Sequence, residues 1–328
     1  MGKYLARRLL NYVVLVFIAT SMAYLLAAVT LNPRTHFEGR NPPVPVSVQD
    51  NTLSQYNLND KTPVLERYGT WLSGLAHGDL GKTWAGSSIN AEASRRMWVS
   101  GQLLLIGTIL GGLLGIAAGA YAAVKQYKLP DNMLSTGAFV LLATPVFVLA
   151  ILLQVMASKF NNAVGHKVFL YSGQYNPAAH GGFFSHTSDR LVHLILPTIT
   201  LTLAGASYLM LYQRNAMLDV LGSDYVRTAR AKGLRRTRAL RRHALRTALI
   251  PSVTLFTYAF ATIFVGATFT EIIYGWHGMG EWFVQSIQAN DTNAVAAITL
   301  FVAVLVLVAS FLQDIIVGFL DPRVRVGR

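Results

Sequence analysis

The chain has 328 residues, of which 53% are hydrophobic and 13% are charged, with a net charge of +13 and a mean hydropathy of +0.41. Because a soluble domain carries about 25% charged residues, this composition excludes an ordinary soluble protein and indicates an integral membrane protein. The chain contains no cysteine, which excludes disulfide frameworks, thiolate chemistry and cysteine-ligated metal centres.

Six stretches are apolar and long enough to cross a bilayer, which requires about 20 helical residues. They are approximately 9–29, 102–124, 135–157, 191–212, 252–273 and 294–320. The first follows three basic residues, as a secretory signal does, but its apolar core is longer than the usual stretch of about 7–15 residues. Five more spans follow it, so we expect an uncleaved first helix and an all-α, polytopic membrane protein with six transmembrane helices.

The segments between the spans differ in their content of Lys and Arg, which predicts the orientation of the chain. The N-terminus, 125–134, 213–251 and the C-terminus together hold 18 of these residues, whereas 30–101, 158–190 and 274–293 together hold 10. The positive-inside rule then places both termini and 213–251 in the cytoplasm. Much of the net charge reflects this orientation, so we expect no nucleic-acid partner.

The external segments carry weaker structural signals. The first half of 30–101 is rich in proline and is expected to be irregular, whereas 62–75 has the apolar spacing of a helix and 89–99 that of a short amphipathic helix at the outer interface. We assign little regular structure to 158–190. Within the third span, Pro145 is expected to bend the helix.

Four glycines recur at every fourth position of the second span: Gly107, Gly111, Gly115 and Gly119. This spacing places them on one helix face, and small residues in register let helix backbones approach closely in lipid. The stripe indicates helix packing, either tightly within this chain or at a subunit interface.

Motifs of catalysis are weak. The triplet Gly81-Lys82-Thr83 resembles the end of a phosphate-binding P-loop, but the first glycine of that motif is missing and no buried strand precedes it. Neither a metal-binding HExxH pattern nor a nucleophile elbow occurs. Glu271 and Asp314 lie toward the ends of spans, so we assign them structural roles. We therefore expect no enzyme activity and no cofactor in this chain, and any ATP that it uses to be hydrolysed by a partner.

The stretch from Asp224 to Pro251 is strongly basic and helical in pattern. An acidic first residue such as Asp224 suits a helix N-terminus, and Gly233 permits a turn. The first helix has small apolar residues (Ala229, Ala231, Leu234) among basic ones (Arg227, Arg230, Lys232). Two interpretations remain open: an amphipathic helix lying on anionic lipid, or a helix that inserts into a protein cleft, which small residues favour.

Residues 224–234, which read DYVRTARAKGL, resemble the "EAA" loop of ABC-importer permeases in the form used by the dipeptide/oligopeptide branch. Arg227, Thr228 and Ala229 stand at the E-A-A positions and Gly233 at the loop glycine, while a segment beginning at His243 replaces the usual ending.

Other segments resemble motifs of the same branch in order and spacing. They are Tyr68-x-x-Trp71-Leu72 followed by Gly78-Asp79-Leu80-Gly81, His193-Leu194-Ile195-Leu196-Pro197, Glu271-Ile272-Ile273-Tyr274-Gly275 with Gly278-Met279-Gly280, and Asp321-Pro322-Arg323. The chain departs from the branch after the first span, where Asn32-Pro33-Arg34 replaces a Pro-Gly-Asp-Pro turn, and at His277, which replaces a proline.

The resemblance implies a B-type permease subunit with a type I ABC-importer fold. It divides the chain into a peripheral N-terminal helix at 1–30, an extracytoplasmic region at 31–101, a five-helix core at 102–320 that includes the loop at 213–251, and a cytoplasmic tail at 321–328. It implies a multi-pass protein of the bacterial inner membrane that imports peptides. ATPase coupling would fall to Asp224, Tyr225, Arg227, Thr228, Ala229, Lys232, Gly233, Leu234 and His243.

The implied partners are a paralogous permease, two ABC ATPase subunits that bind ATP and Mg²⁺, an extracytoplasmic substrate-binding protein, membrane lipid and the peptide substrate. An alternative is a secondary transporter driven by ions or protons without ATPases, and a third is a lipid-anchored scaffold.

Overall fold

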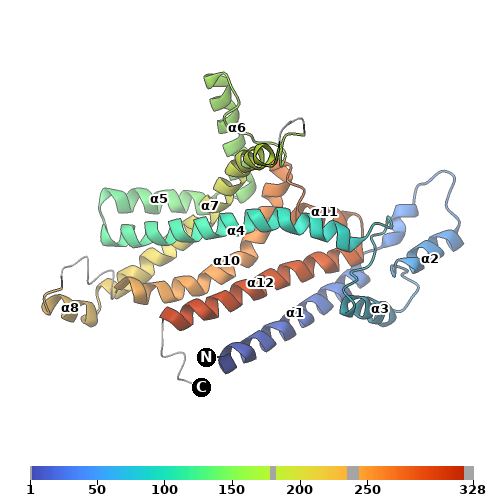
Figure 1. Ribbon diagram of the computed structural model, residues 1–328, viewed down its shortest axis with the longest axis horizontal. Coiled ribbons are helices and arrows are strands. Elements are labelled where there is room, and N and C mark those ends of the chain that lie inside the picture. Colours follow the sequence, from blue (N-terminus) through green and yellow to red (C-terminus); the bar gives the residue numbers. More distant parts are fainter. Residues whose placement is uncertain (1, 178–181, 235–243, 321–328) are drawn as a thin grey trace. The chain divides into compact units, whose positions relative to one another are not determined.

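The computed structural model describes residues 2–177, 182–234 and 244–320, and in these ranges the regular structure is helical apart from one isolated bridge between Lys82 and Ser88 (Figure 1). The elements are α1 (Gly2–Thr30), the 3-10 helix η1 (Pro33–Phe37), α2 (Val46–Gln55), α3 (Val64–Ala76), α4 (Ile89–Val124), α5 (Leu129–Ala143), α6 (Val146–Val164), α7 (Phe183–Leu221), α8 (Asp224–Ala231), α10 (Leu245–Tyr274), α11 (Met279–Gln288) and α12 (Thr292–Leu320). The prediction of an all-α protein is confirmed.

The chain forms two compact units. Unit 1 comprises Met1–Arg7, Gly101–Trp276 and Val308–Arg328, and unit 2 comprises Arg8–Ser100 and His277–Leu307. The long helices α1, α4 and α12 contribute residues to both units.

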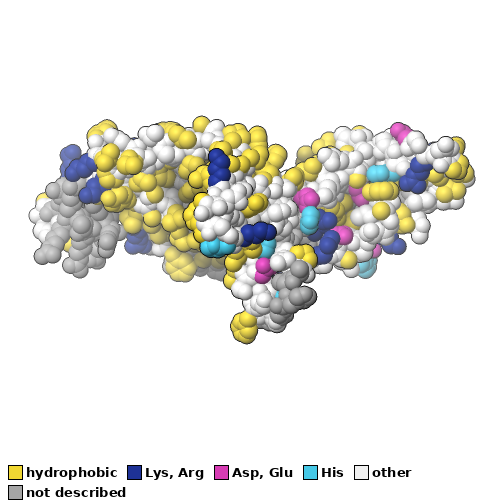
Figure 2. Space-filling view, turned by 90° about the horizontal axis from the view of Figure 1, so that it is seen from above, with side chains coloured by type: hydrophobic (Ala, Val, Ile, Leu, Met, Phe, Trp, Pro, Cys, Tyr) yellow, Lys and Arg dark blue, Asp and Glu magenta, His cyan; other side chains and the backbone are white. Residues whose placement is uncertain are grey.

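Helix length and apolar composition identify the helices that can span a membrane. Among the described residues, five helices are long and apolar enough to cross a bilayer: Ala6–Thr30, Ile89–Val124, Val146–Val164, Phe184–Leu221 and Thr292–Leu320. The predicted fifth span lies within α10, which has 30 residues. Hydrophobic side chains cover much of the visible surface in Figure 2, as expected for helices that face lipid or other apolar partners.

The third predicted span is broken rather than bent. Thr144 (φ −88°, ψ 119°) and Pro145 (φ −55°, ψ 140°) are both non-helical, so α5 ends and α6 begins on either side of them. Proline disfavours the helical conformation in the residue before it and lacks an N–H to continue the ladder. The 15-residue α5 is too short to cross a bilayer alone, whereas α6 has 19 residues.

The segments 30–101 and 158–190 contain more helix than the sequence predicts. The predicted helix at 62–75 corresponds to α3, but the segment expected to be irregular contains η1 and α2. The helix predicted at 89–99 is not separate, because α4 continues without interruption to Val124. Residues 158–190 include the end of α6 and the first residues of α7. The differences between prediction and structure arise because the apolar periods in these segments are short and no strong helix-stop signal marks where each helix ends.

Unit 1 is built around α7, which packs against α5, α6 and α10. The glycine stripe of α4 also faces α7. A Cβ added at Gly115 would lie 2.7 Å from the backbone oxygen of Ala206, and one added at Gly111 would lie 3.2 Å from that of Thr202. These distances leave no room for a side chain between the two backbones.

In unit 2, one aromatic cluster joins α1 to α3 and to the beginning of α12. The ring of Tyr24 stacks on Trp71 with centroids 4.7 Å apart, and Ala28 and Ala296 complete the cluster. Buried Arg67 donates to the backbone oxygen of Ala28 at 3.2 Å. These contacts hold α3 against α1 and α12 of the same unit.

Candidate functional site

The first half of the basic stretch forms a short helix that ends at a sharp turn. Helix α8 follows Ser223 and begins at Asp224, whose carboxylate lies 3.9 Å from the guanidinium of Arg227 with both side chains exposed. The hydroxyl of Thr228 donates to the backbone oxygen of Asp224 at 2.8 Å. After α8, Gly233 has a φ of +88°, a left-handed conformation that L side chains rarely adopt. Glycine at this position therefore lets the chain leave the helix abruptly.

The apolar residue Val226 anchors α8 to the rest of unit 1. The side chain of Val226 is 3% exposed and packs in a cluster with Ala123 of α4, Met217 of α7, and Ala244 and Ala248 at the beginning of α10. Among the side chains of α8 that the structure describes, Val226 thus shares one buried cluster with residues of α4, α7 and α10. Sequence analysis missed Val226, although it is the one aliphatic β-branched residue within this basic helix.

The predicted coupling residues fall into three groups. Asp224, Tyr225, Arg227, Thr228 and Ala229 lie on α8. Lys232, Gly233 and Leu234 follow it directly, where Lys232 and Gly233 are exposed and Leu234 is partly buried. His243 and the Asp321-Pro322-Arg323 segment lie outside the described residues. The structure therefore brings eight of the nine candidates together on one short helix and its turn.

An ion pair between Asp131 and Arg214, close to the C-terminal end of α7, was not predicted from the sequence. The guanidinium of Arg214 makes two contacts with the carboxylate of Asp131, at 2.5 and 2.8 Å. The same carboxylate accepts hydrogen bonds from the backbone N–H of Tyr127 and the hydroxyl of Ser135, and it is 1% exposed. This bidentate pair joins α5 to α7 about two turns before α7 ends. The two residues are 83 positions apart, so spacing in the sequence carries no signal for it.

The motif Gly78-Asp79-Leu80-Gly81 forms a tight turn in unit 2. Both glycines have positive φ, +77° and +88°, and the side chain of Asn90 accepts from the N–H of Leu80 and donates to the backbone oxygen of Gly78. The turn is fixed at the beginning of α4 by these two hydrogen bonds.

Two acidic residues of unit 2 have pKa values that are shifted in opposite directions. Hydrogen bonds from Lys61 and Arg34 lower the pKa of Asp50, whereas burial raises the pKa of Asp291 just before α12. The Asp291 carboxylate accepts hydrogen bonds from the N–H groups of Trp84 and Ala294. In unit 1, Glu271 and Asp314 are buried. Among the described residues, no group of three His, Asp or Glu side chains is placed to hold a metal ion.

Known proteins resemble this chain over its whole length. It is 48% identical over 327 residues to the "Oligopeptide transport system permease protein OppB" of Mycobacterium tuberculosis, with 100% of both chains covered. It is 31% identical to the "Oligopeptide transport system permease protein AppB" of Bacillus subtilis, with 99% of both chains covered, and 32% identical to OppB of Escherichia coli, with 99% and 100% covered.

The fold has a counterpart among solved structures. An inward-facing structure of the MetNI methionine ABC transporter aligns with a TM-score of 0.52 at 17% identity, covering 70% of this chain and 96% of that one. At this identity the likeness concerns the fold alone. Residues 115–326 match the family described as "Binding-protein-dependent transport system inner membrane component", a range that includes α8 and the glycines at 115 and 119. The chain belongs to the family of inner membrane components of binding-protein-dependent transport systems.

Proposed function

We propose that this chain is the permease subunit of an ATP-driven oligopeptide importer and forms half of its translocation pathway. The observation that carries the proposal is the 48% identity, over the full length of both chains, to a protein named as an oligopeptide permease. The inner-membrane family and the all-helical fold agree with this assignment.

In this proposal the protein lies in a bacterial inner membrane with both termini and α8 on the cytoplasmic side. The excess of Lys and Arg in 125–134 and 213–251 supports this orientation. Unit 2, which contains η1, α2 and α3, then includes the extracytoplasmic segments, where a substrate-binding protein would deliver the peptide.

The chain acts without catalytic residues or cofactors of its own. A paralogous permease completes the pathway, and two ATPase subunits bind ATP and Mg²⁺ and supply the work. Helix α8 docks into the ATPase surface through its exposed residues Asp224, Arg227 and Thr228. The small Ala229 suits insertion into a cleft, and Gly233 provides the turn behind the helix.

Force applied to α8 reaches the membrane helices through Val226. Because this side chain packs against α4, α7 and α10 together, a displacement of α8 acts on all three helices. ATP-driven closure of the ATPases would then move the core between inward-open and outward-open states.

Two measurements test the proposal: which chains assemble with this one, and which energy source drives uptake. Purification in mild detergent should yield this chain with a second permease and two ATPase chains, identified by mass spectrometry. In proteoliposomes, peptide uptake should require ATP and persist when an uncoupler removes the proton gradient. Uptake that stops with the uncoupler at constant ATP would assign the chain to the ion-driven carriers instead. Substituting Gly233→Pro should uncouple ATP hydrolysis from uptake, because proline cannot adopt a φ of +88°.

A further inference from the structure

The turn that connects α4 to α5 presents positive charge and large apolar side chains together. Lys125 and Lys128 lie in this turn, and Lys128 is exposed. The ring of Tyr127 between them is 80% exposed, and the nearby side chains of Leu129 and Met133 in α5 are 72% and 65% exposed. Exposed apolar groups beside cations are typical of a surface that meets a membrane.

The turn lies where the apolar part of α4 ends. The 22 residues at 103–124 contain no charged side chain, and Lys125 follows them directly. At a rise of 1.5 Å per residue this stretch is about 33 Å long, which is close to the bilayer hydrocarbon thickness of about 30 Å. Lys125 and Lys128 therefore lie at the level of the lipid headgroups, and Tyr127 lies in the interfacial zone where tyrosine is enriched.

Asp131, the acidic residue nearest to the turn in the sequence, does not neutralise the two lysines. Its carboxylate is 1% exposed and is held by the guanidinium of Arg214, at 2.5 and 2.8 Å, and by the backbone N–H of Tyr127 at 2.9 Å. In the described part of the chain, neither Lys125 nor Lys128 forms an ion pair. The turn therefore presents two ammonium groups without a counter-charge.

Hydrogen bonds fix the shape of the turn. The N–H of Lys128 donates to the backbone oxygen of Lys125 at 2.9 Å, and the N–H of Asn132 donates to the backbone oxygen of Lys128 at 3.1 Å. Tyr127 has a φ of +59°, and its N–H is bound to the buried Asp131 while its ring is exposed. The turn thus holds its exposed groups in place before any ligand arrives, which lowers the entropic cost of binding.

We propose that the turn between α4 and α5 binds the headgroup of an acidic phospholipid, with the phosphate at Lys125 and Lys128 and the acyl chains beside Tyr127. Charge complementarity favours an acidic lipid over a zwitterionic one. A lipid bound at this turn secures the beginning of α5, which has 15 residues and is too short to cross the bilayer alone. The inference goes beyond the proposed function and requires only that the chain lies in a membrane.

The test places a fluorescent reporter in the turn by the substitution Tyr127→Trp. Its quenching is measured in nanodiscs of phosphatidylcholine mixed with phosphatidylglycerol, in which one of the two lipids carries brominated acyl chains. Bromine quenches tryptophan only at short range, so the two measurements give the lipid composition next to the turn. The chain without the reporter gives the background from its five native tryptophans. We expect a preference for phosphatidylglycerol of about thirtyfold, since each basic residue near an acidic membrane surface contributes about 1 kcal/mol.

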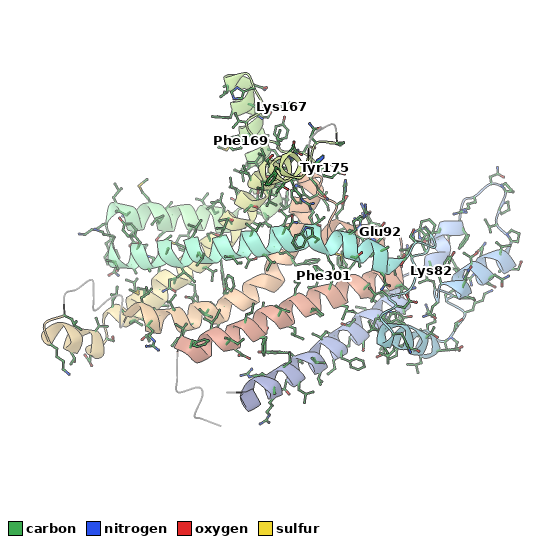
Figure 3. The ribbon with its side chains drawn as sticks, viewed as in Figure 1. Lys82, Glu92, Lys167, Phe169, Tyr175 and Phe301 are labelled. Carbon is green, nitrogen blue, oxygen red and sulfur yellow. The ribbon has the colours of Figure 1, made fainter. Side chains whose placement is uncertain are left out.

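Two pairs of substitutions in the reporter chain test the role of the lysines. Lys125→Gln combined with Lys128→Gln should reduce the preference to about twofold or less, because both cations are lost. The matched control is Lys159→Gln combined with Lys167→Gln, which removes the same charge from exposed lysines in α6 and after it. Figure 3 labels Lys167 beyond the end of α6, away from the turn between α4 and α5. This control should keep the full preference.

Three results would overturn the proposal. Equal quenching by the two brominated lipids would leave the turn to a protein partner. A preference that survives the loss of Lys125 and Lys128, or that the control pair also loses, would show that the charges of the turn do not select the lipid. Inorganic phosphate, added at constant ionic strength, distinguishes a lipid headgroup from a free anion. No change is expected, whereas a preference abolished by free phosphate would assign the site to a soluble anion.

Discussion

Val226 provides the sharpest test of how α8 is connected to the membrane helices. Val226→Ala removes two methyl groups from a side chain that is 3% exposed and lies in a buried cluster with residues of α4, α7 and α10. At about 0.8 kcal/mol for each buried carbon, with an added cost for the cavity, the packing of α8 weakens by about 2 kcal/mol. This energy corresponds to a decrease of about thirtyfold in the ratio of packed to detached α8.

Two assays follow the change. Hydrogen exchange of the α8 amides should become faster, because the helix detaches from its anchor more often. In the reconstituted importer, more ATP should be hydrolysed for each peptide transported, since force applied to a detached helix does not reach α4, α7 and α10. The control is Val48→Ala, which removes the same atoms from an exposed position in α2. Unchanged exchange of α8 together with unchanged coupling would refute the role of Val226 as the anchor.

Three further substitutions test other contacts. Gly115→Ala should lower the melting temperature, because the added Cβ would lie 2.7 Å from a backbone oxygen of α7. The control Gly137→Ala, whose Cβ would have nothing within 4 Å, should leave the melting temperature unchanged or raise it. Equal effects of the two substitutions would contradict close packing of α4 against α7. Asp131→Ala should destabilise the protein by about 2 kcal/mol in thermal unfolding, because it removes a buried carboxylate that accepts hydrogen bonds from the partly exposed Arg214, from Tyr127 and from Ser135, and a loss below about 0.5 kcal/mol would contradict this. Burial raises the pKa of Asp291, so the folded protein retains a proton that the unfolded chain releases above about pH 4. The stability of the wild type relative to Asp291→Asn should therefore fall as pH rises from about 4, and a difference that does not vary with pH would disagree.

Apolar periodicity was a sufficient guide to the membrane helices, because a bilayer imposes both their length and their composition. It was a poor guide at Pro145, where the sequence predicts a bend and the structure has a complete break. The residue before a proline and the proline itself both disfavour the hydrogen-bonded ladder, and whether a helix resumes in the same direction depends on neighbouring helices that composition does not reveal.

In the candidate site too, local features could be predicted from the sequence and tertiary contacts could not. The local features of α8, an acidic start and a glycine turn, are readable because they act within a few residues. The anchoring of Val226 is not readable, since its partners Ala123, Met217 and Ala248 come from three other segments. The pair of Asp131 with Arg214 depends likewise on the packing of α5 against α7. Tertiary contacts between distant segments leave no periodic trace in a single sequence.

The close approach of the α4 and α7 backbones at Gly111 and Gly115 has a mechanical consequence. Interfaces made of side chains can switch between two packings by changing rotamers, but a backbone pressed against a backbone has no rotamers to change. At Gly111 and Gly115 the atoms that would collide belong to the main chain of α7. We therefore expect α4 and α7 to keep their spacing at these two glycines when either helix moves. Thr144 caps the end of α5 and Pro145 caps the beginning of α6, and Pro145 has no N–H to join the two ladders, so α6 can pivot relative to α5 at this position of unit 1 with little loss of hydrogen bonds.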